Sequence, residues 1–365
     1  MDFDPTPEHV LLRDSLRRAL ADPLAPGEAS LWPRCVELGL AALDCRADAA
    51  ADELQCMMIA QEELGRALAA VPFVATVVHA AALLRAAGTP AQHESALACI
   101  ERGEATLALA LAEERSRYAR PAPGVQAVRR DGTWQLDGEL AFVSEGDRAD
   151  GFLIAATHQG APTLLLVPAN APGLARTPVA RLDGHGAADV HLRGVMVPDS
   201  ARVGPEGGAH LLLESVERMG IVAEVAEAVG CMDALLALTV EYLKTRRQFG
   251  RPLGDFQALK HRAADMYVAV EQARSLMYFA TLSCAMNDPV ARARAVAAAK
   301  VQAARSARFV GQQAIQLHGG IGLAEEYRAG HYFRRLTALE LAHGDADDHL
   351  AALGGMGGLF AAADA

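Results

Sequence analysis

The sequence predicts an α+β fold in which helices come first, a β module follows, and a second set of helices completes the chain. Three observations predict this order: apolar residues at helical spacing over the first hundred positions, short strand-like runs beginning near Thr106, and long helical patterns after Gly208. We expect an N-terminal helical domain over 1–104, a middle β-barrel or sandwich domain over 105–204, and a C-terminal four-helix bundle over 205–365.

The N-terminal helices are predicted from their start and stop signals. Thr6, Pro7 and Glu8 supply a hydroxyl cap, a proline at the first helical position and an acid in the first turn. Further helical stretches are expected over 31–40, 51–70 and 74–87. The last of these ends where Gly and Pro appear at 88–90.

The middle module contains strand-like runs separated by turn residues. Asp131 and Gly132 separate the runs 125–128 and 133–136, and an Asp-Gly pair favours a two-residue hairpin turn. Short apolar runs continue the strand pattern, at 106–111, 152–154, 164–167 and 190–192. About a hundred residues of this kind make a domain of ordinary size.

Long helical patterns return in the last third of the chain. They cover 209–245 and 256–285, and a third begins at Asn287-Asp288-Pro289 and ends at Gly319-Gly320. Helices of this length with short connections favour antiparallel neighbours in a bundle.

Composition excludes several classes of function. Lys and Arg number 34 against 45 Asp and Glu, a formal net charge of −11, so a nucleic-acid partner is not expected. Charged residues interrupt the alanine-rich runs before they reach a membrane-spanning length. The acidic start at Met1 to Asp4 lacks the basic region of a signal peptide, and we expect a cytoplasmic protein. The six cysteines form no CxxC pair, so we expect reduced thiols and no metal site.

Two motifs near the C-terminus are more specific than composition. The first is KTRRQFGRPL over 244–253, followed by Phe256-Gln257, and the second is QLHGGIG over 316–322, which leads to Tyr332 and Arg334. Both resemble the acyl-CoA dehydrogenase family, and GVMVP over 194–198 resembles the end of that family's middle domain. The resemblance covers essentially the whole chain. Among subfamilies the resemblance is greatest to the small subunit of pimeloyl-CoA dehydrogenase. The sequence also resembles steroid side-chain dehydrogenases.

The resemblance implies FAD as the cofactor and an acyl-CoA thioester as the substrate. A proton would leave the thioester at Cα and a hydride would pass from Cβ to the flavin. Arg246 matches an arginine that reaches the FAD pyrophosphate across a subunit boundary, a task that suits the planar guanidinium. The same resemblance assigns further cofactor contacts to Phe249, Gln257, Gln316 and Gly320. Two simpler interpretations remain open. Arg246 can be a solvated arginine at a helix end, and Gly320 can serve only to stop a helix.

The middle domain departs from the family pattern at two places. The stretch Ala112 to Tyr118 stands where the family has a glycine-rich loop that contacts flavin and substrate. Phe142 and Ser144 stand where the family has tryptophan and threonine beside the flavin. Phe142 would provide an aromatic wall and Ser144 a hydroxyl donor, although a core phenylalanine and a surface serine explain them equally simply.

Neither of the family's two positions for the catalytic glutamate holds a glutamate here. One position is His343 and the other is Gly220. Glu217 and Glu224 share a helical face with Gly220, and a three-residue shift of alignment would make Glu217 the base. His343 is a second candidate, because a neutral imidazole accepts a proton near pH 7. An alternative is that the glutamates form a solvated or intersubunit stripe.

Several functions remain open on these observations. The leading one is an FAD-linked acyl-CoA dehydrogenase, as the small subunit of a heteromer whose other subunit supplies a glutamate. The others are a homo-oligomeric enzyme that uses Glu217, a flavin monooxygenase on the same fold, and a non-catalytic partner that completes a neighbour's FAD site. The expected partners are therefore another dehydrogenase subunit, in a dimer or tetramer, and an electron-transfer flavoprotein. Aspartates at 345, 347 and 348 would repel a nearby pyrophosphate, which casts doubt on FAD binding by the subunit alone.

Overall fold

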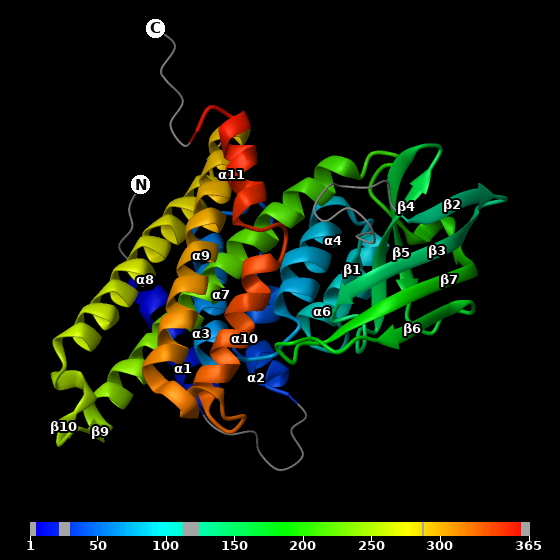
Figure 1. Ribbon diagram of the computed structural model, residues 1–365. Helices are drawn as coiled ribbons and strands as arrows, with labels where there is room; N and C mark the ends of the chain where they lie inside the picture. Colours follow the sequence, from blue (N-terminus) through cyan, green and yellow to red (C-terminus); the bar gives the residue numbers. More distant parts are fainter. Residues whose placement is uncertain (1–4, 22–29, 112–123, 287, 359–365) are drawn as a thin grey trace, which may run out of the picture. The chain divides into compact units, whose positions relative to one another are not determined.

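The computed structural model describes residues 5–21, 30–111, 124–286 and 288–358 (Figure 1). The chain forms two compact units. The helical unit comprises Met1–Pro23, Ala50–Ala69 and Ile221–Ala365, and the sheet unit comprises Leu24–Ala49 and Ala70–Gly220. No helix in the described part of the chain combines the length and the apolar character needed to cross a membrane.

The helical unit is built from antiparallel helices. They are α1 (Pro7–Ala21), α3 (Ala51–Ala67), α7 (His210–Thr245, of which the first residues belong to the sheet unit), α8 (Gln257–Cys284), α9 (Pro289–His318), α10 (Arg328–Leu341) and α11 (Ala346–Gly355). The long helices α8 and α9 lie side by side (Figure 1). The Asp288 carboxylate caps α9 by accepting from the backbone N–H groups of Val290 and Ala291, at 2.9 and 3.1 Å, which confirms the start signal there.

Helices α3 and α7 touch through their backbones at two glycines. A Cβ on Gly230 would lie 1.8 Å from the carbonyl oxygen of Glu62, and a Cβ on Gly65 would lie 2.2 Å from the carbonyl oxygen of Glu227. Both distances are far shorter than any non-bonded contact. The two helices can therefore pack this closely only because neither position carries a side chain.

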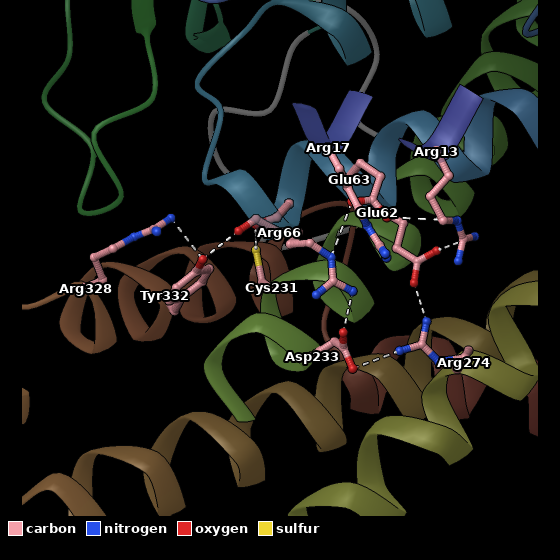
Figure 2. Close-up of polar contacts among 11 residues, drawn as sticks. Arg13, Arg17, Glu62, Glu63, Arg66, Cys231, Asp233, Arg274, Arg328 and Tyr332 are labelled. Carbon is pink, nitrogen blue, oxygen red and sulfur yellow. Dashed lines mark hydrogen bonds and ion pairs between the residues drawn. The ribbon is translucent and has the colours of Figure 1, made fainter. Parts of the chain in front are cut away.

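Two consecutive glutamates of α3 are buried inside the helical unit. The side chains of Glu62 and Glu63 are 0% and 1% exposed, and arginines surround them (Figure 2). Arg13 Nη2 donates to Glu62 Oε2 at 3.0 Å, and Arg274 forms an ion pair with the other Glu62 oxygen. Arg17 Nε donates to Glu63 Oε2 at 2.9 Å. Buried carboxylates are tolerated only when they are paired in this way.

The polar network continues along the same helices. Arg66 pairs with Asp233, and the second Asp233 oxygen lies 3.2 Å from Arg274 Nη2. Tyr332 Oη donates to the Arg66 carbonyl oxygen at 2.5 Å. The Cys231 thiol donates to a backbone carbonyl oxygen at 3.1 Å, and burial raises the pKa of this thiol well above its usual range. Figure 2 shows that these contacts join residues from α1, α3, α7, α8 and α10.

The sheet unit holds one large sheet with short helical segments. The strands are β1 (Leu107–Ala110), β2 (Val125–Arg130), β3 (Thr133–Ser144), β4 (Gly151–His158), β5 (Ala161–Pro168), β6 (Leu174–Pro178), β7 (Ala187–Pro198) and β8 (Arg202–Val203). Their spatial order is β6-β7-β3-β2-β4-β5-β8, and β1 pairs in parallel with β4. The segments before the sheet are α2 (Trp32–Glu37), α4 (Ala82–Ala87), α5 (Pro90–Gln92), α6 (Ala98–Glu101) and π-helical turns over Phe73–Ala81 and His93–Leu97.

Strands β2 and β3 form the expected hairpin. Arg130 pairs with Thr133, and the two residues between them, Asp131 and Gly132, have φ of 48° and 74°. A pair of left-handed residues is the type I′ turn that an Asp-Gly sequence favours. Trp134 then lies fully buried in the sheet's core, and its indole N–H donates to Asp199 at 2.9 Å.

The fold class is confirmed: N-terminal helices, a middle β-sheet domain and C-terminal helices. One expected helix, over 31–40, is shorter than expected and ends at Glu37, because Gly39 takes a φ of 84° that breaks the helix. Strand β6 and helices α10 and α11 were not among the expected elements. The two boundaries between the three expected domains stay a prediction.

Candidate functional site

A two-residue hairpin follows α7 at one end of the helical unit. It pairs β9 (Arg247–Gln248) with β10 (Arg251–Pro252), and the turn residues Phe249 and Gly250 have φ of 52° and 82°. The Phe249 side chain is 89% exposed, and its ring meets the Phe256 ring edge-on at 6.1 Å between centroids. The Phe249 ring is therefore open to a group from outside the helical unit.

Arg246 lies between α7 and this hairpin. Its backbone N–H donates to the Tyr242 carbonyl oxygen at 2.8 Å, which fixes the main chain. Its side chain is exposed and makes no ion pair with any residue that the structure describes. Gln257 is also exposed, as the first residue of α8. Both side chains therefore remain available to a group from outside the helical unit, as the match to a cofactor-binding arginine requires.

The end of α9 carries the second motif. Gly319 has a φ of 64° and ends the helix, so the helix-stop interpretation holds for this glycine. Gly320 does not have a positive φ, so the backbone conformation does not require a glycine there. A Cβ on either glycine would meet no atom within 4 Å. Gln316 is exposed one turn earlier. The open space beside Gly320 fits the close approach of a ligand or of another chain.

Aromatic stacking brings the two motifs to the same end of the helical unit. The Tyr242 ring, one turn before Arg246, lies 4.6 Å from the His318 ring, which follows Gln316 by two residues. Tyr242 Oη also donates to the His318 carbonyl oxygen at 3.3 Å. Burial lowers the pKa of His318, and its Nδ1 contacts the Ala314 carbonyl oxygen at 2.8 Å. Arg246 and Gln316 are thus held on neighbouring helix ends.

The two candidate bases lie in different surroundings. Glu217 is half-buried on the part of α7 that belongs to the sheet unit. His343 lies in the helical unit with a φ of 52°, and its Nδ1 is 3.0 Å from Glu224 Oε2. The His343 carbonyl oxygen accepts from His349 Nε2 at 2.8 Å. The structure therefore brings together His343 and Glu224.

Lys300 completes this cluster. Its side chain is 2% exposed, its Nζ donates to the Leu339 carbonyl oxygen at 2.7 Å, and the same nitrogen lies 3.9 Å from Glu224 Oε2. A cavity of about 10 Å³ beside Glu224 and Lys300 has room for about one water molecule. Sequence reasoning missed Lys300, although a lysine inside the run AAAKV of α9 is a signal of a buried charge.

The pKa of Glu224 reflects two opposed effects. Burial alone would raise it, but His343, Lys300 and Arg335 lower it from 4.5 to about 2. Burial also lowers the pKa of Lys300, an effect that Glu224 opposes. The Glu224 carboxylate thus lies beside Lys300 and His343 in the helical unit.

This depressed pKa predicts a dependence of stability on pH. A carboxyl group with a lower pKa in the folded protein stabilises it above pH 4.5, and the contribution is lost as the pH falls toward 2. Glu224→Gln should therefore reduce the free energy of unfolding by ~3 kcal/mol at pH 7. The difference from the unmodified protein should shrink between pH 4.5 and pH 2. Urea unfolding across this range checks it, with exposed Glu326→Gln as the control; a difference that does not change with pH would contradict the assignment.

Phe142 and Ser144 lie at a bulge near the end of β3. The register against β7 shifts between Leu140 and Val143, and Phe142 has a φ of 57°. Phe142 is 46% exposed and Ser144 is exposed, so the interpretation of Phe142 as a core residue is wrong. The Phe142 N–H donates to Asp189 Oδ1 at 2.8 Å, which holds the bulge. The stretch Ala112 to Tyr118 lies outside the described residues.

The aspartates of the C-terminal tail have a structural role. The Asp345 carboxylate accepts from the backbone N–H groups of Asp347 and Asp348, at 2.9 and 3.1 Å, and caps α11. In the described part of the chain, His9, Asp52 and Cys56 could approach a metal ion together. His9 Nδ1 accepts from the Thr6 N–H at 3.2 Å, and its Nε2 lies 3.0 Å from Asp52 Oδ1. The expectation that the chain holds no metal stays a prediction.

Comparison with known proteins agrees with this architecture. Residues 214–354 match the family model described as acyl-CoA dehydrogenase, C-terminal domain. Two relatives from Mycobacterium tuberculosis are acyl-CoA dehydrogenase FadE27, 29% identical over 96% of this chain and 91% of its own length, and acyl-CoA dehydrogenase IpdE2, 30% identical over 94% and 93%.

Solved structures are similar along nearly the whole chain. The ChsE4-ChsE5 complex from Mycobacterium tuberculosis has a TM-score of 0.85 and 26% identity, covering 97% of this chain and 98% of that one. The Tcur3481-Tcur3483 steroid acyl-CoA dehydrogenase variant has a TM-score of 0.83 and 30% identity, covering 96% and 97%. PigA, with 21% identity, a TM-score of 0.87 and coverage of 98% and 100%, was determined with FAD and proline.

Along the chain, helices precede and follow a β-sheet domain, and the ChsE4-ChsE5 and Tcur3481-Tcur3483 structures resemble this chain over almost its entire length. These two observations define the acyl-CoA dehydrogenase fold. The 30% sequence identity to IpdE2, over 93% of that protein, shows membership of the family as well as a shared fold. The chain belongs to the acyl-CoA dehydrogenase family.

Proposed function

We propose that the chain is one subunit of an FAD-dependent acyl-CoA dehydrogenase, and that a related subunit supplies the catalytic base. The reaction removes a proton from Cα of a thioester and a hydride from Cβ. FAD, when bound, accepts the hydride. The residues of this chain would bind the cofactor, orient the thioester and exclude water.

The observation that carries the proposal concerns the two base positions. Gly220 has no side chain, and His343 is held 3.0 Å from a carboxylate oxygen of Glu224. This contact engages Nδ1 of His343 and fixes the orientation of its ring in the helical unit. Glu217, the third candidate, is half-buried on α7. A base from another subunit would account for this arrangement.

Two comparisons support a heteromer. The ChsE4-ChsE5 complex and the Tcur3481-Tcur3483 protein are each named for two chains, and each resembles this chain over more than nine-tenths of its length. We propose the same kind of assembly here, a dimer or tetramer with a second dehydrogenase subunit.

The cofactor contacts in this proposal are exposed residues. In the helical unit they are Arg246, Phe249, Gln257, Gln316 and Gly320, and in the sheet unit Phe142 and Ser144. Arg246 would pair with the pyrophosphate, because a planar guanidinium matches two phosphate oxygens. Gly320 would let the backbone approach the cofactor, since nothing in the described structure fills that space.

The substrate class follows from subfamily resemblance. We propose a dicarboxylyl thioester such as pimeloyl-CoA, or a bulky ring-bearing thioester, and the Tcur3481-Tcur3483 protein is described as a steroid dehydrogenase. An electron-transfer flavoprotein is the proposed electron acceptor. Dye-linked assays with medium-chain, dicarboxylyl and steroid-side-chain thioesters distinguish these substrates.

Arg246→Ala tests the cofactor site. The change removes a charge-assisted contact worth about 1.5–3 kcal/mol, so the dissociation constant of FAD should rise by about 10- to 150-fold. Flavin content after gel filtration is the measurement, made on the chain alone and on the complex formed by co-expression with a dehydrogenase homologue.

The matched control for this test is Arg262→Ala. Arg262 is an exposed arginine of α8 with no ion pair in the described part of the protein. It has no part in the proposed site, and its removal should leave flavin content unchanged. Full retention of FAD by Arg246→Ala would overturn the assignment of Arg246.

A further inference from the structure

An arginine lies beneath the exposed Phe142 of the sheet unit. Arg181 belongs to the loop between β6 and β7, and its side chain is only 13% exposed. Its Cζ atom lies 5.4 Å from the centroid of the Phe142 ring. A guanidinium over an aromatic face is attracted by the negative face of the ring. The charge of Arg181 is therefore placed directly behind this ring.

A fully buried carboxylate fixes the orientation of Arg181. The Asp183 side chain is 0% exposed, and it accepts from Nε and Nη2 of Arg181, each at 3.1 Å. The His185 N–H donates to the same carboxylate at 3.3 Å. Gly184, with a φ of 76°, turns the chain so that the His185 N–H can reach back to Asp183. A bidentate pair of this kind gives the guanidinium one geometry.

The third guanidinium nitrogen of Arg181 reaches Ser144. Arg181 Nη1 donates to Ser144 Oγ at 3.3 Å. A guanidinium has no acceptor, so the hydroxyl proton of Ser144 must point elsewhere. Within the described residues no acceptor receives that proton. Ser144 is thus arranged as a hydrogen-bond donor toward a group outside the sheet unit.

The backbone at Phe142 supports a functional interpretation of this cluster. A phenylalanine at a φ of 57° costs about 1–2 kcal/mol relative to the right-handed region. The bulge of β3 and the hydrogen bond from its N–H to Asp189 maintain this conformation. Such strain is kept chiefly at binding and catalytic sites.

We propose that Arg181 is a flavin-positioning residue: it orients Phe142 and Ser144 toward the flavin ring, and its positive charge favours the reduced cofactor. The proposal rests on the proposed function, in which Phe142 and Ser144 border the flavin. Reduction adds two electrons and one proton to the neutral ring, so the product carries a negative charge that a nearby cation stabilises. The electrons come from the acyl-CoA substrate, or from a reductant in a titration.

Arg181→Met tests the proposal through the midpoint potential of the bound flavin. The midpoint potential should become more negative by about 30 mV. For a two-electron couple this corresponds to about a tenfold change in the equilibrium constant for flavin reduction. The measurement is a dithionite titration with a reference dye, made on the flavin-loaded chain or on its co-expressed complex. Ser144→Ala should shift the potential in the same direction. The effects of the two changes should not add, because Arg181 acts partly through Ser144.

Two further variants separate this role from a structural one. Arg181→Met removes the bidentate partner of the buried Asp183 and can unfold the sheet unit. Combining it with Asp183→Asn removes the buried carboxylate as well, and the double variant should fold. Its net charge equals that of the unmodified protein, so the part of the potential shift that it keeps reports the lost contacts of Arg181 with Phe142 and Ser144. Arg193→Met removes the same charge from an exposed position on β7 and should leave the potential unchanged.

Each result decides between the proposals. If the unmodified protein binds no FAD, either alone or in its complex, both the proposed function and this inference are wrong. If it binds FAD but Arg181→Met and the double variant leave the potential unchanged, the inference alone fails. An equal shift in Arg193→Met would also overturn it, because the effect would then not depend on the position of Arg181.

Discussion

The Gly230→Ala variant is expected to lose ~3 kcal/mol or more of its unfolding free energy. The added methyl group would lie 1.8 Å from the Glu62 carbonyl oxygen, an atom of the α3 backbone. A backbone atom cannot rotate away as a flexible side chain can, so α3 and α7 would have to separate. That separation would also disturb the ion pairs of Glu62 with Arg13 and Arg274. Urea unfolding followed by circular dichroism measures the loss.

Gly354→Ala is the matched control for this prediction. Gly354 lies in α11, and a Cβ there would meet no atom within 4 Å. Alanine has the higher helix propensity, so this variant should be as stable as the unmodified chain or more stable by about 0.4–1 kcal/mol. If Gly230→Ala behaves in the same way, the backbone contact between α3 and α7 is not as close as the structure has it.

The fold could be predicted because its signals are local. The Asp131-Gly132 turn and the cap at Asp288 depend on a few neighbouring residues, and both form where the sequence places them. Helix α2 is shorter than expected because Gly39 adopts a left-handed conformation that hydrophobic spacing does not report. Strand β6 was missed because four of its five residues are exposed, so it shows no alternation of apolar side chains.

The candidate site could be predicted only in part. The motifs around Arg246 and Gln316 stand out in the sequence, and the structure places both on exposed helix ends. The contact between His343 and Glu224 could not be predicted, because 119 residues separate them. The role of Arg181 depends on a bulge in β3 and a turn at Asp183, and neither has a sequence pattern that points to the other.

The central claim is that this chain depends on a partner subunit for its base. A general base contributes typically about 10²–10⁴-fold to the rate. The chain alone, supplied with FAD, should therefore oxidise acyl-CoA thioesters at least ~100-fold more slowly than the complex with a glutamate-bearing homologue. Neither Glu217→Gln nor His343→Ala should lower the activity of the complex by a comparable factor.

The measurement that tests this claim most directly is the rate of ferrocenium reduction by the chain alone and by the co-expressed complex, with the same thioester. We predict slow turnover by the chain alone, and fast turnover by the complex that is lost when the partner's glutamate is replaced by glutamine. Fast turnover by the chain alone that disappears in Glu217→Gln would show a homomeric enzyme. Fast turnover that disappears only in His343→Ala would make the histidine the base, and either result would contradict the account.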